Sequence, residues 1–319
     1  MDKAVYACDL HCHTTCSDGA DTPQELILHA AKRGIKVLAI TDHDVIPPSD
    51  ILPRENGARV DICEYAASKG IRLLRGIEIS CETEVEDVHI VCFGCDWGAP
   101  FFEKLRAETV QSKINGYKLL IERLREDGML VTWEEVLQNG GNQVKEENVQ
   151  KKMIFELLAR KGYAKDWSEA KLLIKSTEKY QIKRKKPDPT EVIREIHCCG
   201  GYTIMAHPFL IDEPIVIDQQ KLSRADYFER LIEAGLDGIE ACYTYGKTSY
   251  SGELDSREIE NYIREKYEGR LLIISGGSDY HADQKKGVKN PRQLGEAGVT
   301  EEYFMSNPVL HILDYSCGQ

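Results

Sequence analysis

Seven short apolar segments constrain the fold of this chain more than any other feature. They are rich in Val, Ile and Leu and lie at residues 4–10, 36–41, 71–77, 88–94, 202–206, 237–242 and 271–275. Several alternate with helix-like stretches, which is typical of a parallel sheet rather than of a sandwich. Tight connections from strand to helix to strand are right-handed, and about seven of them curl a sheet toward a barrel. The sequence therefore predicts an α/β fold.

The first connection between these segments carries signals for both ends of a helix. Thr22 can cap the helix, Pro23 suits its first position, and Glu25 can complete a capping box. Gly34 can then end the helix. Similar start signals recur at Thr132 with Glu135, Asp166 with Glu169 and Asp188 with Pro189. We expect helices to begin at these positions.

The pattern changes between residues 100 and 186. Apolar strand-like segments vanish there, and a charged sequence with helical periodicity replaces them. We therefore predict that residues 1–99 and 187–319 form the barrel domain. Residues 100–186 would form an all-helical insertion that acts as a cap.

The composition of the chain limits the kinds of molecule that it can bind. The chain has 319 residues and a formal net charge of −12, which opposes binding to long nucleic acid but allows a small anionic substrate. No apolar run approaches the roughly 18 residues of a membrane-spanning helix, so we expect no membrane association. The odd number of cysteines, 11, and the lack of a secretory leader favour reduced thiols and a cytoplasmic location.

Potential metal ligands lie at the ends of these apolar segments. His11 and His13 are separated by one residue, so their side chains would face the same side of a strand. Asp279 and His281 repeat this spacing after the last segment. A single pair of this kind is as often a pair of ordinary histidines as a metal site.

The repetition at successive strand ends favours a metal centre. Six of the seven expected strands end in or carry a potential ligand, and these residues are His11, His13, His43, Glu78, His89, His207, Asp279 and His281. Parallel α/β sheets build their active sites at the carboxyl ends of strands. We therefore predict a metal-dependent hydrolase whose ligands come from both ends of the chain.

The segments that carry these residues resemble a known family. They read DLHCHTTCSDG, ITDHD, GIEIS, VHIVCFG, MAHP and GGSDYH, in that order. In content and order they are similar to the polymerase and histidinol phosphatase (PHP) superfamily. Within it, the chain most resembles the stand-alone phosphoesterases that remove a phosphate from nucleotides, including the 3′,5′-nucleoside bisphosphate phosphatases.

This resemblance implies a distorted (β/α)7 barrel that holds two to three divalent metal ions. The ligands that it implies are His11, His13, Glu78 and Asp279 for a first ion, Glu78, His89 and His207 for a second, and Asp18, His43 and His281 for a third. Asp18 occupies a place where some relatives carry histidine.

The residue types suit hydrolysis of a phosphate ester. Mixed imidazole and carboxylate ligands fit Zn²⁺, Mn²⁺ or Fe²⁺, and Glu78 could bridge two ions roughly 3.5 to 4 Å apart. Such ions lower the pKa of water toward about 7, which supplies hydroxide for attack on phosphorus. The third ion and His43 or His281 would neutralise phosphoryl oxygens and the leaving alkoxide. Asp44 would orient an imidazole ligand.

The insertion offers candidates for substrate contacts, namely Lys113, Lys152 and Arg184. Relatives that act on nucleotides resemble one another in carrying an arginine and an Arg-x-His element there, whereas the matching helices of this chain carry lysines. Lysine lacks the bidentate phosphate recognition of arginine. Arg184 lies in the dense basic run at residues 183–186, which is either a solvated linker or an attractor of phosphate.

These observations predict a phosphoesterase that hydrolyses a phosphate monoester by metal-activated hydroxide. The substrate would be a small phosphorylated molecule, a nucleotide such as a nucleoside bisphosphate or AMP. One alternative is a 5′-3′ exonuclease that acts on short oligonucleotides, because the same metal chemistry cleaves diesters. The other is a non-catalytic module that binds metal or nucleotide.

Overall fold

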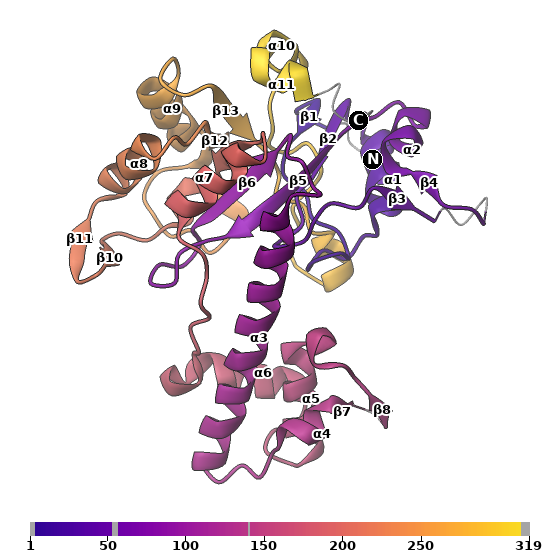
Figure 1. Ribbon diagram of the computed structural model, residues 1–319, viewed down its shortest axis with the longest axis vertical. Coiled ribbons are helices and arrows are strands. Elements are labelled where there is room, and N and C mark those ends of the chain that lie inside the picture. The colour runs from indigo at the N-terminus through magenta and orange to yellow at the C-terminus, as the bar shows by residue number, and fades with distance from the viewer. Residues whose placement is uncertain (1–3, 53–56, 140, 314–319) are drawn as a thin grey trace. The chain divides into compact units, whose positions relative to one another are not determined.

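The computed structural model describes residues 4–52, 57–139 and 141–313. The chain divides into two compact units (Figure 1). One unit comprises Met1–Phe102 with Pro187–Gln319, and the other comprises Glu103–Lys186.

The first unit is built on a seven-stranded sheet, and all seven predicted strands are present. In sheet order, which is also chain order, they are β1 (Cys8–Asp9), β2 (Val37–Ile40), β5 (Arg72–Ser80), β6 (His89–Phe93), β9 (Tyr202–Met205), β12 (Gly238–Cys242) and β13 (Ile273–Gly276). The predicted α/β barrel is therefore confirmed.

One strand departs from the predicted parallel arrangement. β6 runs antiparallel to both of its neighbours, β5 and β9, whereas the other strand pairs are parallel. Hydrophobic periodicity is the same for both directions of a strand, so it carried no information on this inversion. The inversion is the principal distortion of the barrel.

The first and last strands approach each other and nearly close the barrel. The backbone N–H of Leu10 donates to the carbonyl oxygen of Gly276 at 3.3 Å, and that of His13 donates to Tyr280 at 2.8 Å. Gly277 permits this approach, because a Cβ atom there would lie 2.3 Å from the Cβ of His11. Closure brings the two ends of the chain to the same rim.

The helical connections begin largely where capping signals predicted. Thr22 and Glu25 form the capping box of α1 (Pro23–Arg33), which Gly34 ends with a φ of 81°. Asp188 caps α7 (Pro189–Cys198). The other helices of this unit are α2 (Ile62–Ser68), α8 (Arg224–Glu233), α9 (Ser256–Tyr267), α10 (Glu301–Ser306) and α11 (Pro308–Leu313). Two-stranded ribbons also occur at β3 (Asp50–Ile51) with β4 (Val60–Asp61) and at β10 (Ile215–Ile217) with β11 (Gln220–Leu222).

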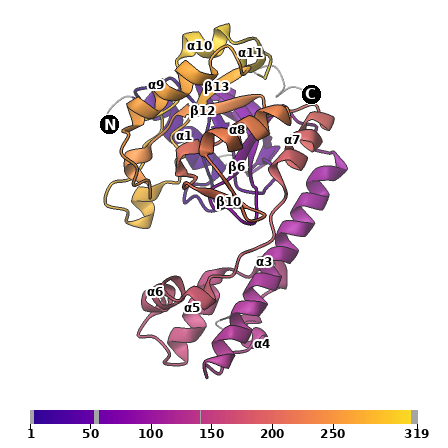
Figure 2. The same ribbon diagram turned by 90° about the vertical axis from the view of Figure 1, so that its left-hand side faces the viewer.

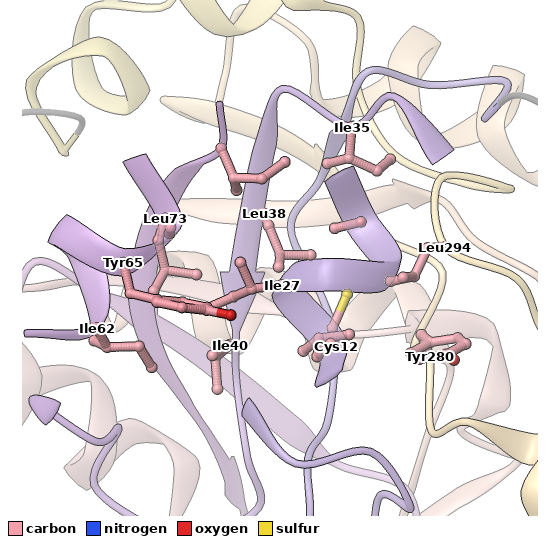
Figure 3. Close-up of a cluster of buried hydrophobic side chains, with 14 of the residues drawn as sticks. Cys12, Ile27, Ile35, Leu38, Ile40, Ile62, Tyr65, Leu73, Tyr280 and Leu294 are labelled. Carbon is pink, nitrogen blue, oxygen red and sulfur yellow. The ribbon is translucent and has the colours of Figure 1, made fainter. Parts of the chain in front are cut away.

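β2 is buried on both faces and illustrates how the core is divided. Leu38 and Ile40 pack in one hydrophobic cluster with Ile27 of α1, as Figure 3 shows. Val37 and Ala39 point to a second cluster on the opposite face. Alternation with period two places neighbouring residues in different clusters. The strand is therefore apolar throughout, as strands of buried parallel sheets are.

The second unit is mainly helical. Figure 2 shows the long α3 (Pro100–Glu126) beside α4 (Trp133–Leu137), α5 (Lys151–Arg160) and α6 (Trp167–Ser176). These helices share a hydrophobic cluster that includes Leu124, Val136, Leu158 and Ile174. One short antiparallel pair, β7 (Gln138–Asn139) with β8 (Asn142–Gln143), departs from the predicted all-helical insertion, because its two residues per strand are too few to leave a periodic signal.

Two further expectations can be compared with the described residues. No helix among them is both long and apolar enough to cross a membrane. Nine cysteines are free thiols, including the buried Cys12 and the exposed Cys16. Cys63 is disulfide-bonded, so the expectation of reduced thiols is wrong at that position.

Candidate metal centre

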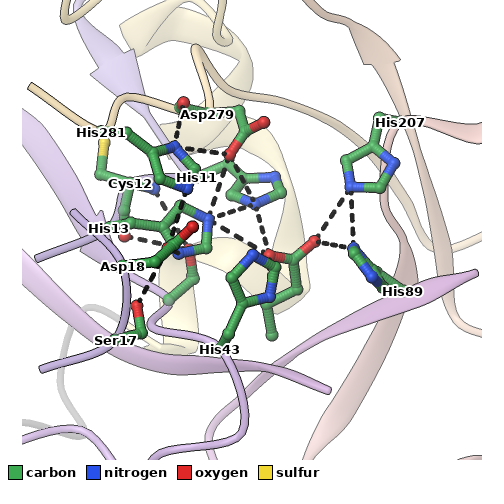
Figure 4. Close-up of polar contacts among 12 residues, drawn as sticks. His11, Cys12, His13, Ser17, Asp18, His43, His89, His207, Asp279 and His281 are labelled. Atoms are coloured by element: carbon green, nitrogen blue, oxygen red, sulfur yellow. Dashed lines mark hydrogen bonds and ion pairs between the residues drawn. The ribbon is translucent and has the colours of Figure 1, made fainter. Parts of the chain in front are cut away.

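The ligand-type residues predicted from the sequence meet at one rim of the barrel. His11 and His13 follow β1, His43 follows β2, and Glu78 lies in β5. His207 follows β9, and Asp279 and His281 follow β13. His89 is the first residue of β6, and because that strand is inverted, its amino end lies beside the carboxyl ends of the others. Figure 4 shows the histidines gathered together.

Glu78 is fully buried and lies at the centre of this group. Its Oε2 atom lies 3.2 Å from Nε2 of His11, 3.2 Å from Nε2 of His13 and 3.1 Å from Nδ1 of His43. One carboxylate oxygen therefore faces three imidazole nitrogens.

The other oxygen of Glu78 faces a second pair of histidines. Its Oε1 atom lies 3.0 Å from Nδ1 of His89 and 3.0 Å from Nε2 of His207. Those two nitrogens are 3.3 Å apart. We name Glu78, His89 and His207 the second cluster, because they correspond to the second of the three predicted ligand sets. Glu78 thus has the position expected of a carboxylate shared between two ions.

The first cluster consists of His11, His13 and Asp279. Oδ1 of Asp279 lies 3.1 Å from Nε2 of His13 and 3.6 Å from Nε2 of His11, and the two Nε2 atoms are 3.1 Å apart. All three side chains are within reach of one cation. This cluster, with Oε2 of Glu78, matches the first ligand set implied by the family resemblance.

The third cluster consists of Asp18, His43 and His281 together with His13. Oδ1 of Asp18 lies 3.0 Å from Nε2 of His281 and 3.9 Å from Nδ1 of His13. The Asp18 side chain is 59% exposed, unlike the nearly buried His281. The third cluster therefore opens to solvent. His13 contributes to it as well as to the first cluster, a sharing that the sequence did not indicate.

Several buried atoms at this rim suit a cation better than a hydrogen bond. Oε2 of Glu78, Nδ1 of His13 and Nδ1 of His43 form no hydrogen bond with any residue that the structure describes. Buried polar groups are normally paired. Imidazole nitrogens and carboxylate oxygens that converge without hydrogen-bond geometry are the donor set of Zn²⁺, Mn²⁺ or Fe²⁺ sites. The residues therefore fit divalent metal ions.

Strong mutual electrostatics perturb the protonation of these groups. Burial would raise the pKa of Glu78, but the imidazoles of His43, His11 and His89 hold it well below its usual range. Burial would lower the pKa of His13, but the carboxylates of Asp279 and Glu78 raise it to about 9. Burial lowers the pKa of His43 to about 3 despite the attraction of Glu78. Such shifts are typical of functional sites.

Two ligand residues have an unusual backbone. His207 has a φ of 27° and Asp279 a φ of 51°, in the left-handed region that non-glycine residues rarely adopt. Strain of this kind persists where surrounding contacts enforce it, and it is common at functional sites.

Asp279 is held by two residues that the sequence did not single out. The hydroxyl of Tyr243 donates to Oδ2 of Asp279 at 2.7 Å, and the guanidinium of Arg292 also contacts this oxygen. Nε of Arg292 donates to Asp283 at 2.9 Å. These contacts leave Oδ1 of Asp279 facing the first cluster.

Glu240 was also missed. It lies in β12, where its carboxylate contacts Nδ1 of His11 at 3.3 Å and accepts the backbone N–H of His207 at 2.7 Å. An acidic residue within the apolar segment 237–242 was the available signal, since a buried carboxylate needs partners.

Asp44, in the loop after β2, links this loop to β5 next to Glu78. Its backbone N–H donates to the carbonyl oxygen of Glu78, and its Oδ1 accepts the backbone N–H of Ser80, both at 2.9 Å. Asp42 accepts hydrogen bonds from Thr14 and Ser17 and so shapes the loop after His13. Both aspartates help position the loops that carry ligands.

The insertion contains a cavity of about 130 Å³ with cations at its wall. It is lined by Gly116, Tyr117, Leu120, Lys151, Tyr180, Ile182 and Arg184. Burial and the nearby Arg184 lower the pKa of both Lys151 and Lys113. Lys152 lies elsewhere, with Nζ 5.2 Å from the centroid of the Trp167 ring. Arg184 and Lys151 therefore line the cavity, whereas Lys152 does not.

Comparison with known proteins places this geometry in context. The chain is 28% identical over 277 residues to the phosphoribosyl 1,2-cyclic phosphate 1,2-diphosphodiesterase of Eggerthella lenta, covering 86% of this chain and 93% of that protein. It is 25% identical over 281 residues to the 3′,5′-nucleoside bisphosphate phosphatase of Chromobacterium violaceum, covering 88% of each. A 5′-3′ exoribonuclease of Haemophilus influenzae is 31% identical over 205 residues, covering 63% of this chain and 68% of that protein.

A solved structure agrees with these relatives. A protein from Bifidobacterium adolescentis, described as a metal-dependent phosphoesterase, superposes with a TM-score of 0.64 at 26% identity and covers 97% of this chain and 98% of its own. Residues 9–293 match the PHP domain family. The match spans the strands that carry the three clusters, and so the chain belongs to the PHP domain family and is a metal-dependent hydrolase of phosphoric esters.

Proposed function

We propose that this chain hydrolyses a phosphate monoester of a small molecule. The substrate would be a nucleotide, either a nucleoside bisphosphate or an AMP-like nucleotide. The observation that carries the proposal is the fully buried Glu78, whose two oxygens face five imidazoles from four different strand ends. This arrangement is suited to a multinuclear centre for in-line displacement at phosphorus.

The proposed cofactors are two to three ions of Zn²⁺, Mn²⁺ or Fe²⁺. The first cluster with Glu78, the second cluster and the third cluster would each hold one. When bound, such ions supply a hydroxide near neutral pH and polarise phosphoryl oxygens. Asp18 of the third cluster is largely exposed, so this is the side that substrate would approach.

The protein's own groups have distinct tasks in this proposal. His43 remains neutral at pH 7, because burial lowers its pKa to about 3, and it can therefore present a lone pair or an N–H without carrying charge. His281 and His43 border the exposed Asp18 and would contact phosphoryl oxygens or the leaving group. Asp44 holds the backbone next to Glu78 and His43 in register.

The insertion supports a substrate with an additional anionic group. Arg184 and Lys151 line its cavity, and Lys113 lies close enough to Arg184 to be affected by its charge. Positive charges held close together repel one another, and an anion that binds beside them relieves this repulsion. The relative that acts on a 3′,5′-nucleoside bisphosphate spans most of this chain, which supports the same substrate class. A cytoplasmic location agrees with this substrate.

Two relatives favour a second candidate, a phosphodiesterase. One is described as a cyclic phosphate diesterase and another as a 5′-3′ exoribonuclease. The formal net charge of −12 favours short oligonucleotides over long ones, since a long polyanion is repelled.

A substrate panel tests the proposal. The purified protein, loaded in turn with Zn²⁺, Mn²⁺ and Fe²⁺, is incubated with a nucleoside 3′,5′-bisphosphate, AMP, a cyclic ribose phosphate and an end-labelled oligonucleotide. The proposal expects phosphate release to be fastest from the bisphosphate or AMP. Release of mononucleotides from the oligonucleotide alone would establish the exonuclease instead. Metal and nucleotide binding with no turnover of any compound would establish the non-catalytic module.

A further inference from the structure

We infer that Glu240 is a positioning residue that holds one ligand of the first cluster and one ligand of the second. Its side chain is 3% exposed and lies in β12. Oε1 lies 3.3 Å from Nδ1 of His11, and Oε2 accepts the backbone N–H of His207 at 2.7 Å. One carboxylate thus contacts two residues that lie 196 positions apart in the chain. This inference rests on the proposed metal site.

The contact with His11 selects which ring nitrogen can bind a cation. A carboxylate oxygen only accepts hydrogen bonds, so Nδ1 of His11 must carry the proton that faces Glu240. Nε2 is then left to present its lone pair, and it is this atom that faces Glu78 at 3.2 Å and Asp279 at 3.6 Å. A carboxylate behind an imidazole ligand fixes the ring orientation and raises its basicity.

The contact with His207 holds the backbone of His207 in place, whereas the contact with His11 holds its imidazole ring. The φ of 27° at His207 is unfavourable for a residue with a side chain. The hydrogen bond from its N–H to the buried Glu240 stabilises this conformation. The same conformation directs Nε2 of His207 to Oε1 of Glu78 at 3.0 Å.

The position of Glu240 in the sheet explains how it reaches both residues. β12 pairs with β9 on one side and with β13 on the other, and Glu240 is paired with Ser275 of β13. His207 follows β9, while His11 lies beside the end of β13 through the closure of the barrel. Glu240 belongs to none of the first, second and third clusters, nor to any other group of potential metal ligands among the described residues. It therefore lies behind the ligands.

The substitution Glu240→Gln tests this role with little change in size. A carboxamide has one acceptor oxygen, so it can accept from His11 or from His207 but not from both. Stepwise Zn²⁺ binding to the chelator-treated protein is measured by competition with a chromophoric chelator. The binding step that depends on the lost contact is expected to weaken, by roughly 10- to 100-fold. Unchanged affinities for both steps in a folded E240Q protein would overturn the inference.

Asp237→Asn is the matched control. Asp237 precedes β12 and accepts hydrogen bonds from the N–H and hydroxyl of Thr203 at 2.8 Å and 3.0 Å. It is a partly buried carboxylate next to the same strand, but it touches no ligand residue of the three clusters in the described contacts. Its loss is expected to lower stability and leave Zn²⁺ affinity unchanged. An equal loss of affinity in both variants would show that Glu240 acts only through stability.

A measurement on the unmodified protein remains decisive if E240Q fails to fold. In the Zn²⁺-loaded wild-type protein, nitrogen-15 spectra of His11 are expected to show a proton on Nδ1 and metal on Nε2. Metal on Nδ1 would overturn the inference, although the proposed function would stand. Failure of the wild-type protein to bind Zn²⁺, Mn²⁺ or Fe²⁺ would instead contradict the proposed function itself.

Discussion

Oε1 of Glu78 in β5 lies 3.0 Å from Nδ1 of His89 in the antiparallel neighbour β6, although the register pairs Glu78 with Val91 and His89 with Ser80. In a wholly parallel barrel, the first residue of a strand would lie at the rim opposite the carboxyl ends. The inversion of β6 therefore brings His89 to the ligands of the other strands. The site depends on this single reversal of chain direction.

Replacement of Glu78 by Gln is expected to abolish activity and disrupt metal binding. The carboxamide removes the negative charge that faces five imidazoles, so the loss should exceed the roughly 100-fold change typical of residues behind the ligands. Metal content by mass spectrometry of the native protein and phosphate release measure the two effects. Glu82→Gln is the matched control, because Glu82 follows β5 but accepts hydrogen bonds from the backbone of Thr83 and Glu84. Full activity in E78Q would contradict the assignment.

Tyr243→Phe is expected to weaken metal binding by roughly tenfold to 100-fold while the fold is retained. The substitution removes the hydroxyl that holds Oδ2 of Asp279 at 2.7 Å. Oδ1 of Asp279 is then freer to rotate away from the first cluster. Tyr245→Phe provides the comparison, since the Tyr245 hydroxyl accepts the backbone N–H of Phe209 instead. Equal metal affinities in the two variants would argue against this role of Tyr243.

Arg184→Gln is expected to raise KM for a nucleoside bisphosphate by roughly tenfold or more, with little change in kcat. The guanidinium lines the cavity of the insertion, and a charge-assisted contact contributes about 1.5–3 kcal/mol. Lys152→Gln should leave KM unchanged, because Lys152 lies over Trp167. Steady-state kinetics distinguish the two variants. The reverse ranking would support the sequence-based prediction for Lys152.

The protonation of His13 predicts how pH acts on the protein stripped of metal by a chelator. Its pKa is raised to about 9 by Asp279 and Glu78, from about 6.5 in the unfolded chain. The associated stability is fully present below pH 6.5 and is lost as the pH rises through 9. It amounts to something on the order of 3 kcal/mol. Denaturant unfolding between pH 6 and 9.5 should show a smaller loss in His13→Gln than in the wild-type protein, because the raised pKa values of His11 and His207 remain in the variant.

Metal addition is expected to reverse that trend. A cation that binds only the folded state stabilises it by about 2.7 kcal/mol at a concentration 100-fold above Kd. Binding also displaces the proton from His13, so affinity should increase as the pH rises toward 9. Thermal unfolding with and without Zn²⁺ at two pH values checks this expectation. A Tm that does not respond to Zn²⁺, Mn²⁺ or Fe²⁺ would contradict it.

Local signals accounted for much of the fold. Thr22 with Glu25 and Thr132 with Glu135 form the predicted capping boxes, because a cap involves residues three positions apart. The seven strands were likewise recognisable from short apolar runs. The direction of β6 was not, since it depends on the path of the chain between strands.

The site was predictable only in part, for a related physical reason. Ligand-type residues at strand ends recur in the sequence, so His11 and its companions could be recognised. Glu240, Tyr243 and Arg292 act through contacts that exist only after the barrel closes. In the insertion, a difference of one helical position separates Lys151 at the cavity from Lys152 over Trp167. Such side-chain directions follow from tertiary packing.

The inversion of β6 also bears on how this barrel can be rebuilt. Adjacent antiparallel strands can be joined by a turn of two residues, whereas parallel neighbours require a long crossover. The insertion occupies the link between β6 and β9, the one connection that follows the reversed strand. Shortening or exchanging this link leaves the order of all seven strands intact. The barrel can thus accommodate a different insertion at this link without any change in its topology.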